Sequence, residues 1–212
     1  DYGNTGSGAP NKSVTGSTIG TTFGTAYSSQ ANVVFTSAFL RRHSGLGTLG
    51  SGGIYKLTPT ASSFTVSTFY DMDANGHRTR AANSAPTYGS GSSYSISGST
   101  ISYLGSTDSE SGSPSGLGVI GSNSGRGLAT NVTSESNDPA AFDQVGKVSL
   151  GGLEVSDDGK YLFVVNLYNR KVYRLTLNDP YNPTAVTAVT SYSLPSVTVT
   201  NGVLRPFGLK YY

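Results

Sequence analysis

Two parts of the chain repeat the same order of strand-like segments and turns. Residues 33–39 and 53–58 have counterparts in residues 162–167 and 171–176, and the second segment of each pair ends in tyrosine, a basic residue, leucine and threonine. β-Branched and aromatic residues dominate all four segments, which is typical of strands. The repeat therefore predicts an all-β fold built from similar units.

The second unit predicts four antiparallel strands joined by short connections. Glycine between strands supplies the backbone conformation that a tight turn needs, and the prolines of the last connection fix its course. We expect strands at residues 148–155, 161–167, 171–177 and 185–194, which together form one meander sheet. No segment combines the apolar spacing of an amphipathic helix with capping residues at its ends.

A four-stranded unit that recurs about every 40 to 55 residues is typical of a β-propeller blade. A third copy begins near the C-terminus, because FGLKY at 207–211 repeats FGTAY at 23–27. Propellers normally close with at least about four blades. The sequence thus predicts an incomplete propeller excerpted from a longer chain, with the missing blades supplied by the rest of the same polypeptide. An ordinary β-sandwich with strands of similar composition is the alternative.

The chain divides into five parts on this basis. Glycine and serine dominate a long central stretch, which contains a short predicted hairpin at 94–104. The parts are an extended N-terminal arm at 1–20, a first propeller blade at 21–83, a Ser/Gly-rich insertion or degenerate blade at 84–144, a propeller blade at 145–200, and the first strand of a following blade at 201–212.

Composition indicates an exported protein. Gly, Ser and Thr make up about 40% of the 212 residues, 12% are charged, and the formal net charge is +2. The chain has no cysteine, which excludes disulfides, thiolate zinc sites and cysteine nucleophiles. The densest basic group, Arg170, Lys171 and Arg174, lies on a predicted ordinary strand, so we expect no nucleic-acid partner. The chain has no apolar run of membrane-spanning length, so we expect no membrane span. The start at Asp1 without a leader indicates a processed or excerpted form.

Several of the same segments resemble a known group of proteins. The similar segments are FGTAY at 23–27, AFLRRHSGLG at 38–47, GGIY at 52–55, VGKVSLGGL at 145–153 and NGVLRPFGL at 201–209. They look like the opening blades of the β-propeller region of large secreted or cell-surface proteins of Bacteroidetes-type bacteria. These adhesin-like proteins often carry Ig-like or serine-aspartate-type repeat domains. The resemblance covers 23–83 and 145–212, and it implies a propeller fold and a secreted or cell-surface location.

Arg41, Arg42 and His43 are the candidate ligand-binding residues. They stand where a predicted long strand leaves its sheet, a position at which propellers often present ligand-binding groups. His43 is suited to acid–base work, but such work needs a second positioned group, and His77 is the only other histidine. An interblade salt bridge or a loop hydrogen bond is the alternative role for Arg41 or Arg42.

Asp71, Asp73 and Asn75 form the candidate metal site. With Gly76 they reproduce the first half of a calcium-binding loop, in which oxygen ligands alternate along the chain. The full loop has a glutamate at position twelve, and here that position is Ala82. Calcium is therefore the one cofactor considered, and a plain turn is the alternative because Asp and Asn also form turns.

The sequence favours a non-enzymatic, secreted or cell-surface β-propeller segment for adhesion or recognition within a larger surface protein. A glycan or a protein is the expected ligand. One alternative is a propeller enzyme acting on polysaccharide, a hydrolase or lyase that uses His43 with Arg41 or Arg42. Another is a structural subunit of an extracellular filament or secretion assembly, in which the insertion forms the contacts between subunits.

Overall fold

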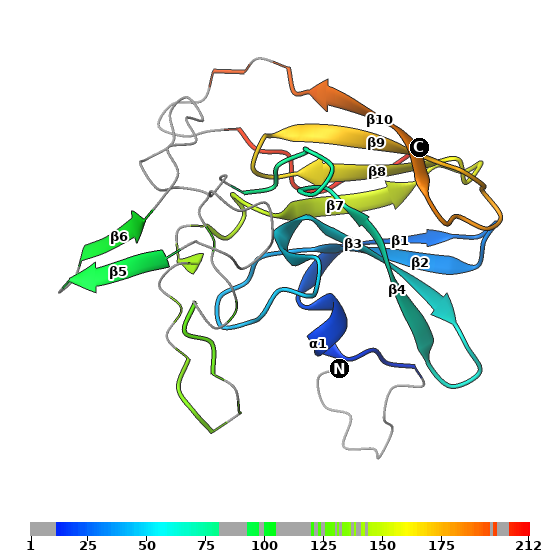
Figure 1. Ribbon diagram of the computed structural model, residues 1–212. Helices are drawn as coiled ribbons and strands as arrows, with labels where there is room; N and C mark the ends of the chain where they lie inside the picture. The colour runs from blue at the N-terminus through cyan, green and yellow to red at the C-terminus, as the bar shows by residue number, and fades with distance from the viewer. Residues whose placement is uncertain are drawn as a thin grey trace.

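The computed structural model contains two four-stranded antiparallel sheets and a separate two-stranded hairpin (Figure 1). It describes residues 12–80, 93–97, 100–104, 120, 123, 126–129, 131, 133–136, 138, 141–142, 144–195, 197–198 and 204–212. Within these residues the fold is mostly β with few helices, as the sequence predicts.

Each four-stranded sheet is a meander in which consecutive strands are neighbours. The first sheet consists of β1 (Thr22–Ser28), β2 (Val33–Ala38), β3 (Gly53–Pro59) and β4 (Phe64–Asp71). The second consists of β7 (Leu150–Val155), β8 (Tyr161–Asn166), β9 (Lys171–Leu177) and β10 (Val186–Ser193). The hairpin consists of β5 (Ser93–Ser97) and β6 (Thr100–Leu104), and the short helices are α1 (Gly16–Ile19) and η1 (Gly50–Gly52).

The predicted strands of both units and the predicted hairpin are confirmed, with ends shifted by one or two residues. Helix α1 lies in the region expected to be an extended arm. It has four residues, and the side chain of Thr15 at its N-cap makes no capping hydrogen bond, so no cap fixes this helix. The C-terminal segment 204–212, expected to be a strand, contains no assigned strand.

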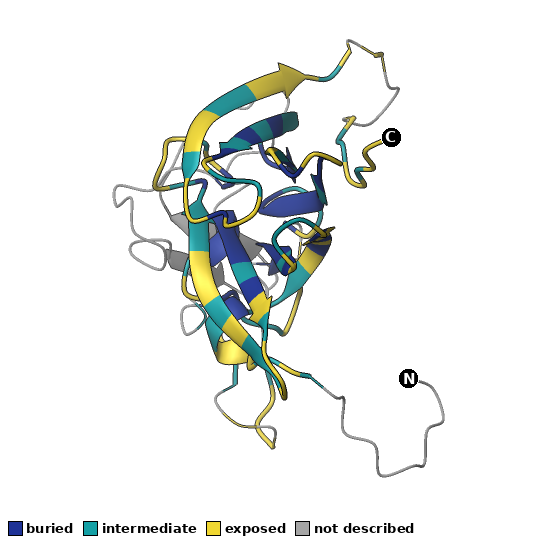
Figure 2. Cartoon of the chain, turned by 90° about the vertical axis from the view of Figure 1, so that its right-hand side faces the viewer, coloured by how far each residue is buried: buried dark blue, intermediate teal, exposed yellow. Residues whose placement is uncertain are grey.

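The largest apolar core lies between the two sheets. Phe35 and Ile54 of the first sheet pack with Leu162 and Leu175 of the second, and all four side chains are fully buried. In Figure 2 the buried residues gather inside the molecule, whereas the outermost strands β4 and β10 are largely exposed or half-buried. Burial of such side chains stabilises the fold by about 1.5–3 kcal/mol each, so each sheet depends on the other.

The first strands of the two sheets approach each other too closely for side chains. A Cβ atom at Gly24 in β1 would lie 2.5 Å from the carbonyl oxygen of Gly151 in β7. A Cβ atom at Gly151 would lie 2.6 Å from the carbonyl oxygen of Phe207, so glycine is required at both positions. The rings of Phe23, Phe39 and Phe207 meet beside this contact, with centroids 4.6 to 5.7 Å apart. β1, β7 and the C-terminal segment therefore follow one another around a shared aromatic cluster.

The N-terminal segment covers the other face of the first sheet. Ile19 of α1 packs with Tyr55 and Leu57 of β3, and Leu49 packs against the same cluster. The Leu49 amide donates a hydrogen bond to the Tyr55 hydroxyl over 2.9 Å. Burial raises the pKa of the Tyr55 hydroxyl. The described part of the predicted arm is thus docked on the sheet, and residues 1–11 lie outside the described residues.

The described residues of the predicted insertion that follow the hairpin dock on the loop after β2. Ile120 and Ala141 pack in a buried cluster with Leu40, Leu46 and Tyr168. The insertion therefore shares an apolar contact with both sheets and lies over the segment that carries the candidate ligand-binding residues.

None of the helices among the described residues has the length and apolar character needed to cross a membrane.

Candidate functional site

The candidate ligand-binding residues lie on an exposed loop that follows β2. The side chains of Arg41, Arg42 and His43 are all exposed. The guanidinium carbon of Arg42 lies 4.9 Å from the centre of the Phe142 ring, which is itself 61% exposed. At this distance the cation is attracted to the electron-rich ring face. The structure brings the three predicted residues together on one surface and adds Phe142 to them.

A buried ion pair holds this loop from the side of the insertion. The side chains of Arg126 and Asp138 are completely buried and make two hydrogen bonds, of 2.6 and 3.1 Å. Arg126 Nη2 also donates to the carbonyl oxygen of Arg41 over 2.7 Å, and the His43 amide donates to Asp138 Oδ2 over 2.9 Å. Arg41 therefore takes part in a hydrogen bond of the loop through its backbone carbonyl, whereas the alternative role considered above concerned its side chain.

A third contact fixes the far end of the loop. Asn123 accepts a hydrogen bond from the Leu46 amide over 3.0 Å and donates one to the Leu46 carbonyl over 2.9 Å. Between these anchors His43 has a φ of 58°, a left-handed conformation that is uncommon for a residue other than glycine. Such a conformation persists only where the surroundings enforce it. The loop is thus held in one shape by the insertion.

The described residues around His43 do not form a catalytic triad. His43 Nδ1 lies 3.3 Å from the Ser136 hydroxyl. The nearby carboxylate of Asp138 binds the His43 backbone amide and the Arg126 side chain instead of the imidazole ring. A triad needs the third group to orient the ring of the base, and here Asp138 orients the loop.

The candidate metal residues lie at the end of β4, beside Gly52. Asp71 Oδ1 accepts a hydrogen bond from the Ala74 amide over 3.2 Å, and Asn75 Nδ2 donates to the Asp71 carbonyl over 2.7 Å. Both oxygens of Asp73 are occupied by hydroxyl and amide donors from Ser51 and Thr79. No group of three or more His, Cys, Asp or Glu residues among those described is placed to hold a metal ion. Calcium binding stays a prediction, and Ala82 lies outside the described residues.

Burial raises the pKa of the Asp71 carboxyl, and the neighbouring charge of Asp73 raises it further. Hydrogen bonds from the Ala74 and Asp73 amides act in the opposite direction, because they favour the ionised form. The balance resists ionisation of this carboxyl.

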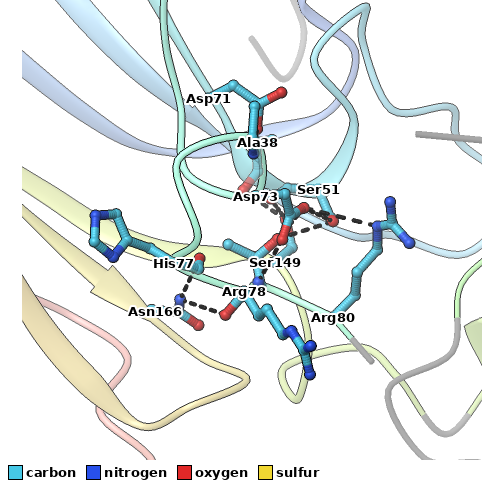
Figure 3. A network of polar contacts seen from close by, with 11 residues as sticks. Ala38, Ser51, Asp71, Asp73, His77, Arg78, Arg80, Ser149 and Asn166 are labelled. Carbon is cyan, nitrogen blue, oxygen red and sulfur yellow. Dashed lines mark hydrogen bonds and ion pairs between the residues drawn. The ribbon is translucent and has the colours of Figure 1, made fainter. Parts of the chain in front are cut away.

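Asp73 belongs to a polar network that joins the two sheets (Figure 3). The Ser149 hydroxyl lies 2.8 Å from the carbonyl oxygen of Ala38 and 2.9 Å from that of Ser51. Across the same contact, Asn166 Nδ2 donates to the Arg78 carbonyl over 2.8 Å. These contacts give Asp73 and its neighbours a structural role at the boundary between the sheets.

Comparison with protein-family models, curated proteins and solved structures finds no match for this chain. Function must therefore be inferred from the geometry of the site.

Sequence reasoning missed the residues that build the site around the predicted loop. The Ser/Gly-rich insertion at 84–144 contains Arg126, Asp138 and Phe142. The only sequence signal there is that charged and aromatic residues are rare. Arg126 is the only basic residue of this Ser/Gly-rich tract, which makes it a candidate for a specific contact, whereas Asp138 is one of five acidic residues there. That reasoning identifies Arg126 as a candidate but does not pair it with the loop after β2.

Proposed function

We propose that this protein is a non-enzymatic recognition module of the β-propeller type, secreted or displayed at a cell surface within an adhesin-like protein. We propose that it binds a glycan or protein ligand through Arg41, Arg42, His43 and Phe142. The observation that carries the proposal is the cation–π pair of Arg42 and Phe142 on a loop held by a fully buried ion pair.

The repeated sheets support the propeller part of the proposal. Both sheets are four-stranded meanders with the same strand order, and their first strands lie side by side. Glycine permits the close approach at two successive contacts, first at Gly24 and then at Gly151. Two sheets cannot close a ring that normally needs at least about four blades, so the proposal includes further blades. The exposed C-terminal segment, with Phe207 and Tyr211 on its surface, marks one place for them.

Pre-organisation of the loop supports the recognition part. Exposed arginine and aromatic side chains are common anchors of binding sites because they offer large contact area and charge together. Holding such groups in the bound arrangement before binding lowers the entropic cost of association. The contacts of Arg126, Asp138 and Asn123 to the loop backbone serve this purpose. They leave the side chains of Arg41, Arg42 and His43 exposed.

The arrangement around His43 supports recognition over catalysis. Its ring has the Ser136 hydroxyl as a neighbour, and the Asp138 carboxylate is committed to Arg126 and the loop backbone. A general base within reach of a nucleophile needs a group that fixes its tautomer and charge. Asp138 faces the backbone of His43 and does not supply that group.

An array of glycans and extracellular proteins, probed with the chain in the presence and absence of calcium, tests the proposal. We expect binding that Arg42→Ala and Phe142→Ala each abolish or strongly weaken. Tyr181→Ala is the matched control, because Tyr181 is an exposed aromatic residue outside the site. Polysaccharide turnover that His43→Ala abolishes would contradict the non-enzymatic part, and binding unaffected by both site variants would contradict the assigned surface.

A further inference from the structure

We infer that the surface of Arg41, Arg42, His43 and Phe142 binds acidic saccharides, in which the recognised sugar ring carries a carboxylate. This inference rests on the proposed recognition surface and names its ligand class. Four features carry it: the local charge, the geometry of the Arg42–Phe142 pair, the hydrogen-bonding state of the loop backbone and the fixed shape of the loop.

The local charge is positive. Arg41 and Arg42 are both exposed, whereas the carboxylate of Asp138 is buried and paired with Arg126, so it does not offset them at the surface. Glu135 is an exposed carboxylate of the neighbouring insertion segment. Among the described residues of this surface, two exposed guanidinium groups thus stand against one exposed carboxylate, a balance that suits an anion.

The Arg42–Phe142 pair fits a carboxylated sugar ring. The guanidinium carbon of Arg42 lies over the Phe142 ring, and a guanidinium held over an aromatic face can still offer N–H groups to a carboxylate. Phe142 is 61% exposed, so part of its ring remains available to the apolar C–H face of a sugar. One ring of a uronate polymer presents both features, a carboxylate and an apolar face, within a single residue of the ligand.

The loop backbone favours a saccharide over an acidic peptide. An extended peptide is commonly bound through main-chain hydrogen bonds. In this loop the amides of His43 and Leu46 and the carbonyls of Arg41 and Leu46 are already bonded to Asp138, Asn123 and Arg126. Recognition therefore falls to the side chains, which offer charge and ring surface.

The test is direct binding of the chain to polygalacturonate, measured by calorimetry at low and high salt. Dextran is the neutral comparison and poly-glutamate is the acidic peptide comparison. We expect binding to polygalacturonate that weakens as salt screens the exposed charges. Arg42→Ala should weaken it at least about tenfold, because a charge-assisted hydrogen bond is lost.

Matched variants separate charge from shape. Arg42→Lys keeps the charge but loses the planar fork, so we expect an intermediate loss. Glu135→Gln removes the neighbouring negative charge and should strengthen binding. Lys160→Ala removes an exposed cation paired with Asp158 in the β7–β8 turn, outside this surface, and should leave binding unchanged.

Three outcomes overturn the inference: no binding to polygalacturonate, equal binding to dextran, or equal binding to poly-glutamate. The last result would assign the surface to acidic peptides instead. Failure of the recognition proposal is distinguishable, because the array described above can still reveal a different ligand that depends on Arg42 and Phe142. In that case the recognition surface stands and the acidic saccharide class falls.

Discussion

Asp138→Ala is the perturbation that most directly examines how the insertion shapes the loop. The substitution removes both hydrogen bonds to Arg126 and the one to the His43 amide. The guanidinium of Arg126, completely buried, then has no counter-ion in this pair. Leaving one member of a buried ion pair alone destabilises a protein by about 3–5 kcal/mol. The expected loss is therefore a large part of the total stability of an ordinary domain.

Urea unfolding followed by circular dichroism measures this loss, and hydrogen exchange locates it. We expect faster exchange at residues 41–46 and 144–148, while β8 and β9 keep most of their protection. Asp157→Ala is the control, because Asp157 is an exposed turn residue and should stay within about 0.5 kcal/mol of the wild type. The double variant Arg126→Met/Asp138→Leu removes both charges and should recover most of the stability.

Two results would refute the reasoning. One is a loss below about 1 kcal/mol for Asp138→Ala, which would show that the pair is not desolvated in solution. The other is a double variant no more stable than the single one, which would show that packing or the His43 contact, and not the uncompensated charge, dominates.

Three further changes give defined outcomes. Burial raises the pKa of the Asp71 carboxyl in the folded protein, so protonation of this carboxyl stabilises the fold. The stabilisation is complete below the ordinary pKa of 3.8 and is lost as the pH rises through the pKa of the folded protein. Asp71→Asn should therefore be more stable than the wild type at neutral pH in thermal melts, with the gain vanishing in acid. Tyr55→Phe leaves the Leu49 amide without its acceptor and should cost about 1–3 kcal/mol in urea unfolding. Gly24→Val places a Cβ atom 2.5 Å from a β7 carbonyl and should destabilise by at least about 1–3 kcal/mol in the same assay, whereas Gly16→Val, with no atom within 4 Å, should not.

The strands were predictable because their signal is local. The apolar run LFVVNL at 162–167 and the alternating segment KVYRLT at 171–176 are signals that act over a few residues. The turn before the first of these carries glycine where a positive φ is needed, Gly159 at 70°. The match between the two units then followed from sequence alone. α1 was not predictable, since a four-residue helix without a capping side chain leaves no pattern.

The site was only half predictable because its contacts are long-range. The exposed Arg41–His43 segment could be proposed from its position after a strand, but its anchor Asp138 is 95 residues from His43 in the chain. The Asp71 and Asp73 spacing suggested a cation site from local order. Sequence could not reveal that Ser51 and Thr79, brought near by the fold, occupy the Asp73 oxygens.

The polypeptide leaves the first sheet and enters the second at almost the same point. The Ser149 amide donates a hydrogen bond to the Thr79 carbonyl over 2.7 Å. The two ends of the segment 80–148 are therefore joined to each other between the sheets. Lengthening or shortening a segment whose ends are already joined changes its closure entropy only slowly. The position between Thr79 and Ser149 is therefore an insertion site that tolerates segments of different length and sequence. Replacing the inserted segment would change the binding specificity while the two sheets stay the same.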